Sequence, residues 1–282
     1  METIRNVLQK GIGFLEKKGL HPARRLMEDL LIFYLKKSRC DLYLCFEQPL
    51  EEVELVPIRS ALIRLTQHEP LEYILGKHLF YGLELTIEPS VLVPRPETEI
   101  LVDLIVQKIR SCPKKQASFW DVGTGSGAIG LGIKKALPEL LVTLSDICPR
   151  ALELAGRNAA EHSLDVRLLQ GDLFSPFSRE EKFDFLVFNP PYLSQEAYAK
   201  ADPALHREPK IALVSGPTGL EFYERFAGSV RAYLAPSAAI FLEIGFDQGE
   251  AVQKIFSDAF WKKREVLFDW SGHTRFFFLE TD

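Results

Sequence analysis

The sequence predicts an α/β protein in which a mostly parallel sheet, with helices on both faces, follows a small helical bundle. Three observations predict this fold. Apolar residues recur at helical spacing near the start of the chain, short apolar segments alternate with helical segments from Ser118 onward, and a glycine-rich turn follows the first of these segments. Strands that alternate with helices are typical of a parallel sheet, because each parallel connection needs a crossover.

Residues 1–75 are predicted to form a helical domain. Apolar residues from Ile4 to Leu15 return every three or four positions, which favours a first helix. Pro22 is suited to open a second helix, because the first helical position tolerates the missing N–H. A third helix is expected from about Val53 to Gln67. Three helices of this length predict a small bundle.

A β-hairpin is predicted as the linker over residues 76–94, where two apolar segments flank Gly82. The main domain is predicted over residues 95–282 and begins with a helix from about Glu97 to Ile109. The link at residues 270–272 is too short for a crossover, so the last two strands should pair antiparallel. The expected strands are residues 118–122, 140–146, 165–169, 183–188, 238–244, 263–268 and 274–280.

The composition indicates an ordered, globular chain. Of its 282 residues 46% are hydrophobic and 26% are charged, and the formal net charge is −5. An acidic balance disfavours a stable complex with nucleic acid, because such binding is dominated by lysine and arginine. No apolar stretch reaches the length of a membrane span, and the first residues do not resemble a signal peptide. We expect a soluble, cytoplasmic protein, a monomer, with no membrane partner.

The cysteines and histidines predict no metal site. The six histidines are scattered, and no two cysteines form a CxxC pair. Few, unpaired cysteines are also typical of a reducing compartment. The four cysteines are Cys40, Cys45, Cys112 and Cys148.

The glycine-rich turn is predicted to hold an anionic ligand. It joins the strand ending at Val122 to a helix, so glycines allow a sharp bend and a close approach of the ligand to the backbone. The free N–H groups at the helix start then face the anion. Spacing leaves two ligands open, the pyrophosphate of NAD and the carboxylate of S-adenosylmethionine. The candidate cofactor-binding residues of this turn are Gly123, Thr124, Gly125, Ser126 and Gly127.

Three further residues are predicted to contact a nucleoside. Asp146 ends the next strand, where a carboxylate can accept hydrogen bonds from both ribose hydroxyls. It can also cap the helix that starts near Pro149. Asp172 and Leu173 follow the third strand and lie at the same sheet edge, where Asp172 or the backbone of Leu173 can meet the adenine. Asp172 can equally be an ordinary acidic residue of a turn. NAD and S-adenosylmethionine both carry a ribose, so these residues do not choose between them.

The segment Asn189-Pro190-Pro191-Tyr192 indicates the chemistry. It follows an apolar strand, and the active crevice of an open parallel sheet lies at the carboxyl ends of its strands. The Asn189 side-chain oxygen and the Pro190 carbonyl can each accept a hydrogen bond from an NH2 group on an sp² carbon. The prolines make these acceptors rigid, and Tyr192 offers a flat face to a planar group. We predict Asn189 and Pro190 as catalytic and all four residues as substrate-binding.

At this point the sequence resembles the HemK/PrmC-type glutamine methyltransferases, which modify peptide chain release factors. The resemblance extends over nearly the whole chain. In some relatives a tryptophan occupies the position of Leu173. Leucine has no aromatic ring to stack on adenine, so an apolar contact is what remains here. The segments that carry the resemblance are Pro94–Glu99, Asp121–Ile129, Asn189–Tyr192, Arg207–Pro209 with Ala212-Leu213, and Leu242–Gly249.

The resemblance implies a Rossmann-like class I methyltransferase sheet, with an antiparallel last strand and an N-terminal domain that recognises the substrate. It implies S-adenosylmethionine as the cofactor, bound by the glycine-rich turn, Asp146 and Asn189. It also implies that the methyl group goes to the side-chain amide nitrogen of the glutamine in the Gly-Gly-Gln motif of release factors. That modification supports translation termination.

Three alternatives remain at this level. A DNA adenine amino-methyltransferase can also use such a segment, but it needs a sizeable DNA-reading region. Here residues 1–75 hold 11 basic and 11 acidic side chains, which gives no attraction to DNA. An NAD-dependent oxidoreductase explains the glycine turn and Asp146 but gives Asn189–Tyr192 no role. A binding module without catalysis is disfavoured by the regular glycine-rich turn between strand and helix.

Overall fold

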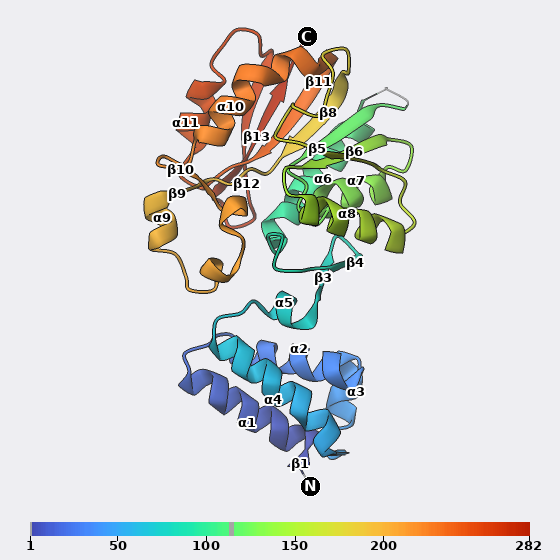
Figure 1. Ribbon diagram of the computed structural model, residues 1–282, viewed down its shortest axis with the longest axis vertical. Coiled ribbons are helices and arrows are strands. Elements are labelled where there is room, and N and C mark those ends of the chain that lie inside the picture. Colours follow the sequence, from blue (N-terminus) through green and yellow to red (C-terminus); the bar gives the residue numbers. More distant parts are fainter. Residues whose placement is uncertain (1, 113–115) are drawn as a thin grey trace. The chain divides into compact units, whose positions relative to one another are not determined.

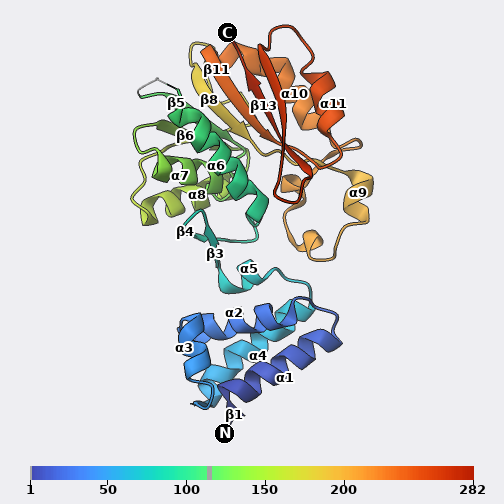
Figure 2. The same cartoon turned by 180° about the vertical axis from the view of Figure 1, so that it is seen from behind.

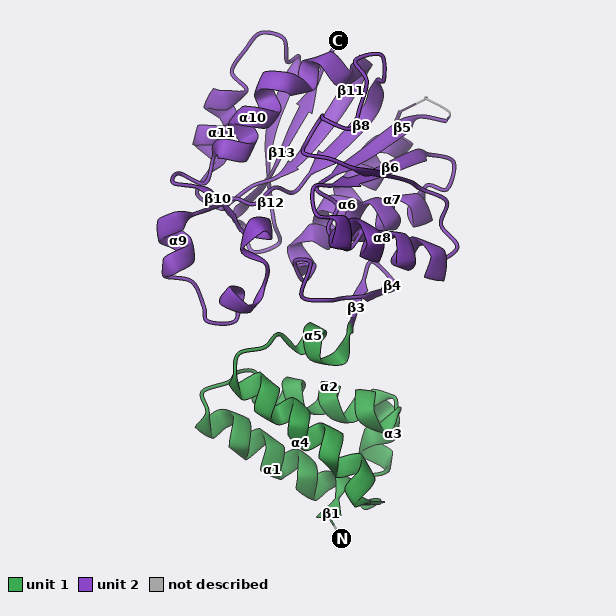
Figure 3. Ribbon diagram, in the orientation of Figure 1, with its two compact units in different colours: residues 1–76 green, residues 77–282 purple. Residues whose placement is uncertain are grey.

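The computed structural model describes residues 2–112 and 116–282 and divides the chain into two compact units. The first unit extends to Gly76 and the second from Lys77 to Asp282 (Figure 3). Among the described residues, the large sheet of the protein lies in the second unit, and the first unit has only a two-stranded pair. None of the described helices has the length and apolarity needed to cross a lipid bilayer.

The first unit is an α-helical domain with more helices than the sequence predicts. A two-residue strand pair, β1 with β2, ties its start to the segment before α4. The two additional helices, α3 and α5, are too short to show a periodic apolar pattern. A local signal does mark α3, where Ser38 and Asp41 form a capping box. The elements are β1 Glu2–Thr3, α1 Ile4–Lys17, α2 Ala23–Leu35, α3 Arg39–Leu44, β2 Pro49–Leu50, α4 Glu52–Thr66 and α5 Leu71–Leu75.

The core of this unit lies between α1, α2 and α4. Helix α1 buries Ile4, Leu8 and Leu15, as its spacing predicts. Gly11 allows α1 and α2 to approach closely, because a Cβ atom there would lie 2.3 Å from the Met27 sulfur. The sequence pattern of α1 therefore describes its buried face correctly. In α2 the apolar face expected at Leu26, Leu30, Phe33 and Tyr34 is wrong, because only Leu30 of these is buried and the helix instead buries Ala23, Met27 and Leu31.

The second unit has a seven-stranded sheet in the order β12-β13-β11-β8-β5-β6-β7. The strands from β11 to β7 run parallel, and β13 pairs antiparallel with both β11 and β12. The predicted α/β class and the antiparallel end of the chain are thus confirmed. The strands are β5 Ser118–Val122, β6 Leu141–Asp146, β7 Arg167–Gln170, β8 Phe183–Phe188, β11 Leu234–Glu243, β12 Lys263–Phe268 and β13 Thr274–Glu280.

The starts of two predicted strands differ from the structure by more than one position. Strand β7 begins at Arg167, two positions later than expected, and β11 begins at Leu234, four positions earlier. The start of β11 contains Pro236 and Ser237, and Ser237 has a positive φ of 57°. The pairing with β8 shifts register there, which is why the sequence pattern hides this end of the strand.

Helices cover both faces of the sheet (Figures 1 and 2). Helices α10 and α11 pack on one face, where Tyr223, Phe226 and Val252 join the core formed around Trp120. Helices α6, α7 and α8 lie on the other face. The helices and short 3-10 turns are α6 Pro96–Arg110, α7 Ala128–Ala136, α8 Pro149–Glu161, α9 Gln195–Ala199, Leu205–Arg207, Lys210–Ala212, α10 Glu221–Ser229, Val230–Tyr233 and α11 Gly249–Ile255.

Two small strand pairs complete this unit. The hairpin of β3 Lys77–Phe80 and β4 Leu83–Thr86 is antiparallel around Gly82, as its sequence predicts. Beyond β8, β9 Leu193–Ser194 pairs parallel with β10 Val214–Gly216. This second pair holds the base of a long excursion that contains α9 and two of the 3-10 turns.

Candidate active site

The glycine-rich turn lies between β5 and α7 and bends through positive φ angles. Gly123, Gly125 and Gly127 have φ of 66°, 57° and 87°, which side chains rarely allow. A Cβ atom on Gly127 would also lie 2.9 Å from the Leu131 side chain. The turn is anchored to β6, because the Thr124 N–H donates to the Ser145 carbonyl at 2.9 Å. Glycine is therefore required here for the backbone conformation itself.

The buried carboxyl of Asp121 stabilises the turn through hydrogen bonds. Its Oδ2 accepts hydrogen bonds from the Thr124 hydroxyl at 2.7 Å and from the Gly130 N–H at 2.9 Å. Only 1% of Asp121 is exposed, and this burial raises the pKa of its carboxyl to about 7. Asp121 thus ties the turn to the first helical residues of α7.

Asp146, at the end of β6, lies beside the turn. Its Oδ2 accepts a hydrogen bond from the Gly125 N–H at 2.9 Å, and its Oδ1 accepts one from the Cys148 N–H at 2.8 Å. Burial raises the pKa of Asp146 above its usual range, against the effect of these donors. The carboxylate therefore connects the glycine-rich turn to the start of α8 while it also borders a cavity.

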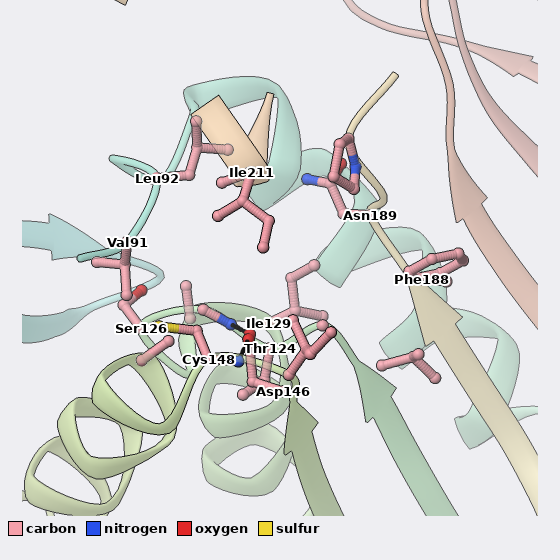
Figure 4. Close-up of a pocket in the computed structure, with 18 of the residues that line it drawn as sticks. Val91, Leu92, Thr124, Ser126, Ile129, Asp146, Cys148, Phe188, Asn189 and Ile211 are labelled. Carbon is pink, nitrogen blue, oxygen red and sulfur yellow. Dashed lines mark hydrogen bonds between the residues drawn. The ribbon is translucent and has the colours of Figure 1, made fainter. Parts of the chain in front are cut away.

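That cavity, of about 190 Å³, opens where the strands of the sheet end. Figure 4 shows Thr124, Ser126 and Asp146 on one side, with Asn189 across from them. The adjacent strand ends of β6, β5 and β8 supply these residues. Nine predicted residues line the cavity: Gly123, Thr124, Gly125, Ser126, Asp146, Asp172, Leu173, Asn189 and Pro191.

Three other predicted residues lie outside the cavity lining. Gly127 caps α7 and is buried beneath the turn. Pro190 is also buried, and Tyr192 packs against the core of the sheet. Burial raises the pKa of the Tyr192 hydroxyl to about 12. The substrate contacts expected from Pro190 and Tyr192 stay predictions.

Asp172 and Leu173 lie at the edge of the cavity, after β7. Asp172 forms an ion pair with Arg225 of α10, with 2.5 Å between Oδ2 and Nη2. Leu173 has a positive φ of 48° and lies partly buried against the core. The charge of Asp172 is therefore paired with a cation, and Leu173 packs against the protein core while it also lines the cavity.

The Asn189–Tyr192 segment is also held by a side chain from another loop. The Gln248 side chain donates hydrogen bonds to the Tyr192 carbonyl at 2.9 Å and to the Gly219 carbonyl at 3.2 Å. Its Oε1 accepts the Gly245 N–H at 2.9 Å. One amide side chain thus fastens the segment to the loop that follows β11.

Sequence reasoning missed the wall of the cavity opposite the glycine-rich turn. Val91, Leu92 and Ile211 form part of it, from segments far apart in the chain (Figure 4). A buried side chain joins these segments, because Glu208 accepts hydrogen bonds from the Val93 N–H at 3.0 Å and from Arg95 at 2.5 Å. The signal available in the sequence was the Arg207–Pro209 motif, which carried part of the resemblance but had no assigned role. Other lining residues without a prior assignment include Arg95, Thr98, Ile129, Cys148, Ala212 and Phe222.

The described residues, 2–112 and 116–282, contain no group of three or more histidine, cysteine or acidic side chains placed to hold a metal ion. The polar groups of the cavity include backbone amides of the turn, the carboxylates of Asp146 and Asp172, the Asn189 carboxamide, two arginines and several hydroxyls, and the rest is largely apolar. This set fits a nucleoside that carries a charged amino acid group.

Two family models match the chain. The PrmC N-terminal domain matches residues 6–76, and the methyltransferase small domain matches residues 97–216. A release factor glutamine methyltransferase from Chlamydia trachomatis is 40% identical over 279 residues, which is 98% of this chain and 94% of the relative. One from Geobacter sulfurreducens is 38% identical over 256 residues, 90% of this chain and 88% of the relative. Among solved structures, a methyltransferase from Pyrococcus furiosus has a TM-score of 0.52 at 16% identity, over 71% of this chain and 89% of that one, and supports the fold.

Proposed function

Since the chain belongs to the family of release factor glutamine methyltransferases, we propose that it methylates the side-chain amide nitrogen of the glutamine in the Gly-Gly-Gln motif of peptide chain release factors. The methyl donor is S-adenosylmethionine, the cofactor of the methyltransferase domain that matches residues 97–216. The activity supports translation termination, which is the step in which release factors act.

One observation carries this proposal: Asn189 borders the same cavity as the glycine-rich turn and Asp146. The N–H groups of the turn suit the carboxylate of the donor, and Asp146 suits its ribose hydroxyls. Leu173 supplies an apolar surface for the adenine at the far edge. Asn189 lies across the cavity from Asp146 (Figure 4), and we expect the reacting nitrogen to enter beside it.

The chemistry requires positioning more than activation by acid or base. The sulfonium of the donor supplies an activated methyl group, but the amide nitrogen is a weak nucleophile because its lone pair is delocalised. The Asn189 Oδ1 and the Pro190 carbonyl each accept one N–H of the substrate amide. These two bonds fix the NH2 group in place, so that its lone pair can be directed at the methyl carbon.

The substrate is proposed to be an intact release factor, with residues 1–75 as the domain that recognises it. A single glutamine side chain offers few contacts, so specificity should come from a wider protein surface. We propose a monomeric enzyme that acts where release factors act, in the cytoplasm, without a stable complex with nucleic acid. The DNA adenine alternative is disfavoured by the relatives, which are named for release factors.

The test is transfer of label. The purified protein is incubated with labelled S-adenosylmethionine and a release factor, and the label is mapped by peptide mass spectrometry. Label on the glutamine of the Gly-Gly-Gln motif supports the proposal. Label on adenine of duplex DNA, with none on a release factor, contradicts it.

A further inference from the structure

A buried carboxyl lies beside Asn189 at the end of the neighbouring strand. The parallel register pairs Phe188 of β8 with Leu242 of β11, so Asn189 and Glu243 come next at the same level of the sheet. The Asn189 side chain lies near enough to the Glu243 carboxyl to lower its pKa. Only 1% of Glu243 is exposed. The residue proposed to hold the substrate nitrogen is therefore the neighbour of a buried acid.

The carboxyl of Glu243 is also held from α6. The Thr98 hydroxyl donates to its Oε2 at 2.8 Å, and Thr98 itself lines the cavity. Burial raises the pKa of Glu243 to about 7, although the Thr98 and Asn189 hydrogen bonds and the nearby Arg275 lower it. An Asn189 N–H directed at Glu243 has this effect, because a hydrogen bond donated to a carboxylate lowers its pKa.

Charged and titratable groups face Glu243 from each element packed against it. Arg275 comes from β13 and makes an ion pair with Asp269 at 3.5 Å, and Glu97 comes from α6. The Tyr192 hydroxyl is close enough to interact electrostatically with Glu243, and the Tyr223 hydroxyl donates to the Glu243 carbonyl at 2.9 Å. Both tyrosines have pKa values raised by burial, so they stay neutral near pH 7.

The orientation of a primary amide depends on the hydrogen-bond partners of its NH2 group and of its carbonyl oxygen. If the Asn189 NH2 faced the substrate NH2, two donors would oppose each other and the substrate would lose an acceptor. An ionised carboxylate only accepts hydrogen bonds, so it binds the NH2 end of Asn189 and leaves the oxygen for the substrate. A protonated carboxyl, or a glutamine, presents both a donor and an acceptor and allows either orientation.

We propose that Glu243 is a positioning residue that holds the Asn189 amide with its oxygen toward the methyl-accepting nitrogen. This inference rests on the proposed function, in which Asn189 Oδ1 accepts a substrate N–H. A merely structural role would not need the charge, because a glutamine oxygen can accept the Thr98 hydroxyl equally well. Burying a carboxylate costs stability, which a structural role alone leaves unexplained.

The test compares wild type with Glu243→Gln, and with Glu250→Gln as the matched control. Glu250 is an exposed residue of α11, so its substitution removes the same charge outside the site. Steady-state kinetics on an intact release factor are measured from about pH 6 to pH 9, and donor affinity is measured by calorimetry. For Glu243→Gln we expect kcat at high pH to fall about tenfold or more, with donor affinity unchanged within about twofold.

The pH profile separates positioning from structure. Wild type and the control should lose kcat as the pH falls through about 7, where Glu243 becomes protonated. Glu243→Gln should lack this limb, and it should unfold at no lower temperature than wild type at high pH. Glu97→Gln removes a like charge that raises the pKa of Glu243, so its limb should move to lower pH.

Two results would overturn the inference: a Glu243→Gln variant with wild-type kcat and the same acid limb, or one in which kcat, donor affinity and unfolding temperature all fall together. Failure of the wild-type protein to label any release factor is a different result, and it would overturn the proposed function itself.

Discussion

The Asp146 carboxylate accepts a hydrogen bond from the Gly125 N–H at 2.9 Å, although Asp146 ends β6 and Gly125 lies in the turn after β5. This bond sets the glycine-rich turn against the acid expected to hold the ribose. The two halves of the proposed donor site are therefore built as one unit, and a change at Asp146 should affect both.

Asp146→Ala should weaken donor binding more than it slows chemistry at saturating donor. The variant loses hydrogen bonds from a charged group, each worth about 1.5–3 kcal/mol, so donor affinity should fall roughly 10- to 100-fold. Calorimetry with S-adenosylmethionine measures this. Asp146→Asn keeps an acceptor for the Gly125 N–H and should lose less. Unchanged affinity in the alanine variant would contradict the assignment.

Asn189→Ala should fold and bind the donor but be nearly inactive. The acceptor matters mainly as the nitrogen attacks, so turnover should fall on the order of 100-fold or more. Single-turnover rates on a release factor, with donor affinity measured in parallel, check this expectation. Near-normal turnover at saturating substrate would argue against the Asn189 mechanism.

Stability should fall as the pH rises from about 4 to about 7, and Asp121→Asn should reduce that loss. Burial raises the pKa of Asp121 from 3.8 to about 7 in the folded state. A raised acid contributes stability that is fully present below its unfolded pKa and lost as the pH rises through the folded value. The measurement is the unfolding temperature of both proteins from about pH 5 to pH 8. Equal slopes for wild type and variant would exclude a contribution from Asp121.

Exposed apolar residues on α4 should contribute to recognition of the release factor. Val53, Val56 and Ile63 are 74%, 56% and 55% exposed, and exposed apolar groups often mark an interaction surface. The double variant Val56→Glu with Ile63→Glu should raise the KM for an intact release factor at least about fivefold. Activity on a short Gly-Gly-Gln peptide, expected to be poor in wild type, should not change.

The controls for this prediction use the same helix. Arg59→Gln changes the charge of α4 without adding a carboxylate among the apolar side chains, and it should leave the KM for the factor nearly unchanged. Two results would contradict recognition of the factor by residues 1–75. One is a double variant with the wild-type KM for the factor, and the other is wild-type protein that methylates the peptide as efficiently as the factor.

Local sequence patterns predicted the parts of the molecule that depend on neighbouring residues. The strand Phe183–Phe188 and the turn from Gly123 to Gly127 were placed correctly, because alternation, apolar runs and glycine act over a few positions. The order of strands and helices then implied that Asp146 and Asn189 lie at one sheet edge, and both line the cavity.

Contacts between distant segments were decided only by the tertiary structure. Glu208 meets Arg95 across 113 positions of sequence, and Thr98 meets Glu243 across 145. No local pattern encodes which loop closes over which strand end. The partnership of Asn189 with Glu243 likewise follows from the register of β8 against β11, which forms only when the whole sheet assembles. A one-residue shift would turn the Glu243 side chain to the other face of the sheet.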